Sequence, residues 1–147
     1  MANKDTILAD INRAFGNFPR PQAMVRNPNH CDECADHESV MQAVTPQNVS
    51  LIEVGSPAWD PVCYLTDEAF GYFMPGLVRL ALDENEYLDQ LFFHVENRYS
   101  ALNASQCRAI LQVMDYIGDA MLADIINFSL ESDWDRIRDQ LIAACQE

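Results

Sequence analysis

The hydrophobic residues of this chain recur every three or four positions, which is the spacing of one face of an α-helix. The pattern predicts one helix from Asp5 to Phe15 and another from about His30 to Ala43. Later stripes predict helices that begin at Thr66, near Tyr87, at Asn103 and at Ser132. Glycine and proline residues between these stripes mark the turns.

Two segments depart from this pattern. Pro75 lies inside the stripe that follows Thr66, and because proline lacks a backbone N–H, it predicts two short helices that meet near Met74 and Pro75. Val49 to Val54 alternates weakly between apolar and polar residues and is the best strand candidate. We therefore predict a single globular domain over residues 1–147, all-α or nearly so. It should be a compact bundle of six to seven short helices, with at most one short strand pair.

Three of the predicted helices carry capping signals, and one of them is Ser132, followed by Asp133, at the last helix. Thr66 has a side-chain oxygen suited to the first backbone donors of a helix, and two acids follow it. Asn103 and Gln106 have the spacing of a capping box, in which each side chain accepts from the other residue's backbone N–H.

The chain is strongly acidic, with 23 acidic residues against nine basic ones and a net charge of −14. From Asn27 to Val78 there is no Lys or Arg, and the acids there are Asp32, Glu33, Asp36, Glu38, Glu53, Asp60, Asp67 and Glu68. Such a surface repels nucleic acid and anionic membranes, and attracts a basic protein, a cation or a metal ion. The alternative is that the acids only keep the protein soluble.

The apolar residues and the cysteines indicate the cellular compartment of the protein. No apolar secretion signal opens the chain, and no uncharged apolar run approaches the roughly 18 residues that a membrane span needs. Five cysteines are an odd number, which argues against a disulfide framework. We therefore expect a cytoplasmic protein with reduced thiols. No pattern predicts its oligomeric state.

The most unusual local feature is a cluster of metal-ligand residues: His30, Cys31, Cys34 and His37. Cys31 and Cys34 have the spacing of half a structural zinc site, and thiolate and imidazole are the ligands that zinc prefers. Two objections apply, because no second ligand pair follows and four ligands on one regular helix would strain a tetrahedral site. The alternative is a core thiol at Cys34, with His30 and His37 as cap and surface residues.

Few features of the sequence indicate a catalytic function. The acids around Cys31 and Cys34 are expected to raise the pKa of these thiols, which argues against a redox role. No phosphate-binding loop, nucleophile elbow or zinc-protease helix is present, so we assign no catalytic and no cofactor-binding residue.

Three blocks of the chain resemble a family of small bacterial proteins that is classed as a domain of unknown function. The residues are His30-Cys31-x-Glu33-Cys34-x-x-His37, then Trp59-Asp60-Pro61-x-x-x-Leu65-Thr66-x-Glu68-x-Phe70-x-Tyr72-Phe73-x-Pro75, then Gln106 and Tyr116. The resemblance covers roughly residues 28 to 117. It implies a bacterial cytoplasmic protein with a helical fold, and it transfers no catalytic residues.

The sequence leaves two hypotheses of function. The first is an interaction protein of the immunity or antitoxin kind, whose acidic face binds a basic protein partner. The second is a metal-binding protein, with zinc held by His30, Cys31, Cys34 and His37, and with an open position if the protein is an enzyme.

Overall fold

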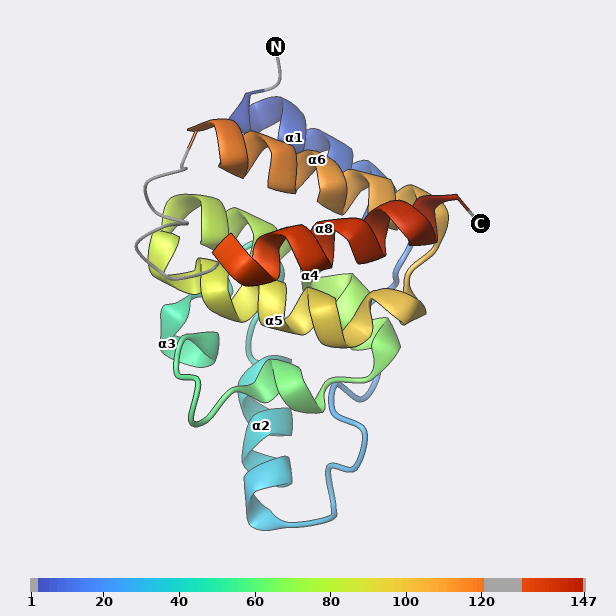
Figure 1. Ribbon diagram of the computed structural model, residues 1–147. Coiled ribbons are helices and arrows are strands. Elements are labelled where there is room, and N and C mark those ends of the chain that lie inside the picture. Colours follow the sequence, from blue (N-terminus) through green and yellow to red (C-terminus); the bar gives the residue numbers. More distant parts are fainter. Residues whose placement is uncertain (1–2, 121–130, 147) are drawn as a thin grey trace.

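The computed structural model describes residues 3–120 and 131–146, and within them the protein has seven α-helices and no strand (Figure 1). The helices are α1 (Lys4–Phe15), α2 (Asp32–Gln42), α3 (Leu51–Val54), α4 (Asp67–Asp83), α5 (Leu88–Arg98), α6 (Ala104–Ala120) and α8 (Glu131–Cys145). Short 3-10 helices are η1 (Pro61–Tyr64), η2 (Asn85–Tyr87) and η3 (Tyr99–Ala101). The all-α prediction is confirmed. Among these residues the nearest feature to a strand pair is an isolated bridge between Val25 and Leu65.

The longer helices form a bundle, and α2 lies at the end opposite to α1 and α6 (Figure 1). α1 packs against α4 and α6, α6 packs against α8, and α5 contacts both α4 and α8. α2 instead packs on η1. The bundle interior is filled by large side chains that are at most 1% exposed, namely Phe15, Phe70, Phe73, Tyr87 and Phe92. None of the described helices is long and apolar enough to cross a membrane.

The capping signals at two predicted helix starts are confirmed. Thr66 accepts a hydrogen bond on its hydroxyl oxygen from the Ala69 N–H at 3.0 Å, at the start of α4. Before α6, the Gln106 N–H donates to Asn103 Oδ1 at 2.8 Å, and the Asn103 N–H donates to Gln106 Oε1 at 3.0 Å. The start predicted at Ser132 is wrong, since α8 already includes Glu131.

The strand predicted over Val49–Val54 is wrong, because its residues form the short helix α3. The Ile52 N–H donates to Ser50 Oγ at 3.3 Å, and the Ser50 N–H donates to Glu53 Oε1 at 2.8 Å. This capping box satisfies donors that a helix start leaves open. It therefore outweighs a weak alternation of apolar and polar residues.

The break predicted at Pro75 is also wrong, because α4 runs through it as one helix of 17 residues. A proline in a helix interior costs about 3 kcal/mol. The residues around it, Phe73, Met74, Leu77 and Val78, are each at most 1% exposed, and burying such a side chain stabilises the fold by roughly 1.5–3 kcal/mol. Packing on both sides of the proline thus exceeds its penalty.

Candidate metal centre

The start of α2 arranges the predicted metal ligands differently from a continuous helix. The helix predicted from about His30 begins at Asp32. Cys31 is its N-cap, in extended backbone with φ −161° and ψ 173°, and His30 precedes it in a turn closed by a bond to the Asn27 carbonyl. Because His30 and Cys31 lie outside the helix, they are not held to helical spacing. The strain expected of several ligands on one helix therefore does not arise for this pair.

Three of the four predicted ligands come together at this helix start. A ring nitrogen of His30 and the sulfurs of Cys31 and Cys34 lie within 4.8 Å of one another. The two sulfurs are 3.2 Å apart, and both thiols are free. Zinc holds donors at about 2.0–2.3 Å in a tetrahedron, which places them about 3.5–3.8 Å from each other. The three donor atoms are therefore close to the spacing that a shared ion requires.

The helix start also lowers the pKa of the Cys31 thiol to about 7. The main cause is the Cys34 N–H, which donates to Cys31 Sγ at 3.4 Å, followed by a hydrogen bond from the His30 side chain. The pKa of Cys34 is raised, first by its hydrogen bond to the Cys31 sulfur and then by burial. Our expectation that acidic neighbours raise the pKa of both thiols is thus wrong for Cys31, because the nearby donors outweigh the acids.

His37 does not join this group. Its side chain is fully buried, with its ring 4.1 Å from the Trp59 ring and 4.7 Å from the Tyr64 ring, measured between centroids. Glu33 Oε1 lies 3.4 Å from Nε2, but neither ring nitrogen has a hydrogen-bond partner of good geometry. The helix register turns His37 toward η1, so it serves as a packing residue between α2 and that segment.

A second group of ligand-type residues joins the η1 segment to α5, and it was not predicted from the sequence. Atoms of Asp60, Cys63 and His94 also lie within 4.8 Å of one another. The Asp60 carboxylate is buried and bonds to His94 Nε2 at 2.8 Å, to Gln90 Nε2 at 3.0 Å and to the Val62 N–H at 3.0 Å. His94 lies 34 positions after Asp60 in the chain, so no local spacing in the sequence could indicate this group.

This second group is a hydrogen-bond network rather than a good metal site. Three protein donors already satisfy the Asp60 carboxylate. Burial, and then the negative charge of Asp60, raise the pKa of the Cys63 thiol, which favours the protonated form that binds metals poorly. The network instead fixes His94 on α5 against η1.

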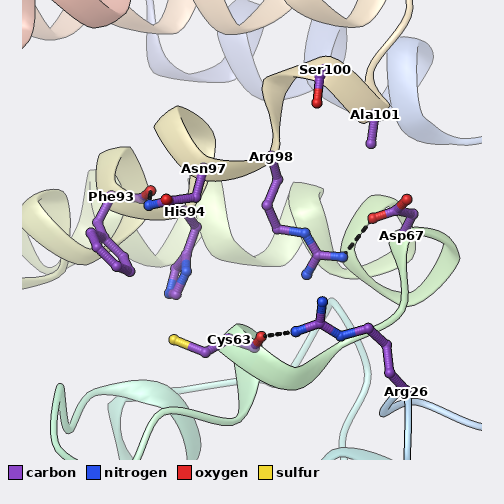
Figure 2. A pocket seen from close by; sticks show the side chains of 9 residues that line it. All are labelled: Arg26, Cys63, Asp67, Phe93, His94, Asn97, Arg98, Ser100 and Ala101. Carbon is purple, nitrogen blue, oxygen red and sulfur yellow. Dashed lines mark hydrogen bonds and ion pairs between the residues drawn. The ribbon is translucent and has the colours of Figure 1, made fainter.

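Two pockets adjoin these groups and share Arg26 in their walls. One, of about 300 Å³, opens beside the metal ligands His30 and Cys34. The other, of about 380 Å³, lies beyond η1 and is lined by the residues labelled in Figure 2. There the Arg98 and Arg26 side chains enter from opposite sides, and Arg98 reaches Asp67 at 2.7 Å.

Comparison of the chain with models of known protein families, with curated proteins and with solved structures gave no match. The resemblance to a bacterial family therefore stays a prediction, and the functional argument rests on the geometry of the chain itself.

Proposed function

We propose that this protein binds a zinc ion through His30, Cys31 and Cys34, with a fourth position open to water or to another ligand. The observation that carries this proposal is the mutual distance of at most 4.8 Å between the three donor atoms. One imidazole and two thiolates form a donor set that zinc favours over calcium or magnesium.

The surroundings of the three ligands support a cation. Asp32, Glu33 and Asp36 are exposed on the first turns of α2, immediately after the ligands. The chain has no Lys or Arg from Asn27 to Val78, and Arg26, which lines the pocket beside His30 and Cys34, already donates to the Cys63 carbonyl. The Cys34 N–H meanwhile stabilises the Cys31 thiolate, which is the form that coordinates a metal. The site thus combines a ready ligand with a negative local field.

The test is the metal content of protein purified without a metal-affinity tag and measured by mass spectrometry. We expect about one equivalent of zinc per chain, lost on Cys31→Ser and on Cys34→Ser. Cys63→Ser is the matched control, since Cys63 is also an exposed free thiol but lies outside the ligand group. Substoichiometric metal that the Cys31 and Cys34 variants leave unchanged would refute the proposal.

The cellular setting follows from the thiols. All five cysteines are free, and a zinc-binding thiol pair persists best under reducing conditions. We therefore infer a cytoplasmic location, in a bacterial cell if the family resemblance holds.

A second proposal is that the acidic segment binds a basic protein. It is supported by Ile52 on α3, whose side chain is 92% exposed within the stretch that lacks Lys and Arg. An exposed apolar residue among acids suits an interface with a basic rim. Against it, Glu38, Glu53 and Asp60 are engaged in bonds within the protein.

Affinity chromatography from the source cells tests this second proposal. We expect a retained protein with an isoelectric point above about 9 that salt elutes and that Ile52→Ser fails to retain. Retention of only neutral or acidic proteins, or retention that Ile52→Ser does not affect, would contradict it.

A further inference from the structure

The pocket of about 380 Å³ in Figure 2 has the size of a small-molecule site and is separate from the metal ligands. Ligand pockets in proteins run from roughly 300 to 1,000 Å³. Its walls come from the segment before α2, from η1, from the start of α4, from the second half of α5 and from η3. None of His30, Cys31 and Cys34 lines it. A ligand bound there would therefore indicate a second function, distinct from metal binding.

The charge of this pocket opposes that of the chain as a whole. Two of the nine basic residues, Arg26 and Arg98, face each other across it (Figure 2), and Asp67 is the acid among its lining residues. A guanidinium carries five donors. Arg26 donates from Nη2 to the Cys63 carbonyl at 2.7 Å, whereas Arg98 donates from Nη2 to Asp67 at 2.7 Å and from Nη1 to the Val62 carbonyl of η1 at 3.4 Å. Each group thus retains donors in the planar arrangement that matches a carboxylate or a phosphate.

The arginine side chains are held in place before any ligand arrives. Arg98 is only 11% exposed and lies over the Phe70 ring, with Cζ 4.7 Å from the ring centroid. Arg26 is tied to η1 twice, through its side chain to the Cys63 carbonyl and through its backbone N–H to the Tyr64 carbonyl at 3.0 Å. A prearranged donor pair loses little entropy when it binds an anion.

The other end of the pocket, away from the two arginines, adds an apolar contact (Figure 2). Phe93 lines the pocket with 55% of its surface exposed, and it is one of two large hydrophobic residues exposed to this degree in the described part of the chain. Beside it, His94 is fixed by the buried Asp60 carboxylate at 2.8 Å. A molecule that combines an oxyanion with an apolar ring would contact both ends of the pocket.

We propose that this pocket binds a small organic anion, with its carboxylate or phosphate held between Arg26 and Arg98 and its apolar part against Phe93. The proposal does not depend on the zinc site.

Calorimetric titration of chelator-treated protein with phenyl phosphate, benzoate and inorganic phosphate tests the proposal. Chelation removes any metal that could itself bind the anion. We expect saturable binding of phenyl phosphate or of benzoate. The ratio of their two affinities decides between a phosphate and a carboxylate ligand. Phe93→Ser should weaken the binding of the aromatic probes while leaving the binding of inorganic phosphate unchanged.

Two variants separate binding from folding. Arg26→Gln keeps a donor for the Cys63 carbonyl but loses the charge, and should weaken the bound probe by about tenfold. Asp67→Asn removes the competing carboxylate of Arg98 and should tighten binding by about two- to fivefold. Loss of structure would not produce tighter binding, so the second variant keeps the test decisive if the first is unstable.

Arg138→Gln is the matched control, because it removes the same charge from an arginine on α8 that pairs with Asp115 at 2.9 Å and does not line the pocket. It should leave binding unchanged. The proposal is overturned if neither aromatic probe binds at millimolar concentration. It is also overturned if Arg26→Gln and Arg138→Gln have equal effects, or if Asp67→Asn does not tighten binding.

Discussion

Replacing Asp60 with alanine tests the network that holds η1 to α5. The carboxylate accepts from the Val62 N–H, from Gln90 Nε2 and from His94 Nε2. Gln90 also donates to the Val54 carbonyl at 3.0 Å, so it keeps one partner after the change. Two buried donors then lose theirs, and each such loss costs about 1–3 kcal/mol. We therefore expect the free energy of unfolding to fall by about 2–6 kcal/mol, a large share of the roughly 5–15 kcal/mol typical of a domain.

Asparagine at the same position should cost much less. Asp60→Asn preserves the shape of the side chain and an oxygen for the Val62 N–H. The new amide group faces Gln90, which keeps its bond to the Val54 carbonyl, and His94, which as a neutral histidine can change tautomer and become an acceptor. We expect less than half of the loss caused by alanine.

Urea unfolding at pH 7, followed by tryptophan fluorescence, measures both effects as shifts of the midpoint at constant slope. Asp119→Ala, an exposed acid on α6, is the control and should change stability by no more than about 0.5 kcal/mol. A loss below about 1 kcal/mol for Asp60→Ala would refute the reasoning that these donors need the carboxylate. Equal losses for alanine and asparagine would refute the claim that His94 can change from donor to acceptor.

Three further predictions concern packing and the thiols. Gly71→Ala should lower the melting temperature, because a Cβ there would lie 2.4 Å from the Phe18 ring. A Cβ at Gly118 meets nothing closer than 3.9 Å, so Gly118→Ala should raise the free energy of unfolding in urea by up to about 1 kcal/mol. In chelator-treated protein the rate of Cys31 alkylation should rise with pH to a midpoint at about 7, since deprotonation makes the reactive thiolate; a midpoint near that of an ordinary thiol would contradict it. His37→Phe should keep its zinc and, because it removes two buried polar atoms without hydrogen-bond partners, unfold at equal or higher urea; loss of zinc with the fold intact would make His37 a ligand after all.

The features predicted correctly from sequence are those that depend on neighbours along the chain. The caps at Thr66 and Asn103 need only a side-chain oxygen and a backbone donor three residues on. The all-α class depends on the same short range, since helical periodicity repeats within every turn. The grouping of Cys31 with Cys34 belongs here too, because both lie at one helix start.

The features that were missed are decided by residues far apart in the chain. Asp60 meets His94 across 34 positions, and no spacing in the sequence could indicate that pair. Pro75 reads locally as a break, but the buried side chains around it hold α4 together. His37 was predicted as a ligand because a helix places it on the same face as Cys34, but its ring lies against Trp59 and Tyr64, which precede α4 in the chain.

One short segment, η1, forms a wall of both proposed sites. Tyr64 stacks on His37 and lines the pocket beside the metal ligands, while Cys63, the residue before it, lines the larger pocket. Arg26 reaches both pockets and bonds to η1 through side chain and backbone. A four-residue 3-10 helix has too few internal bonds to be rigid alone. The buried Asp60 network and the two arginines therefore supply the rigidity that either site would need, which explains why so many polar side chains converge on this segment.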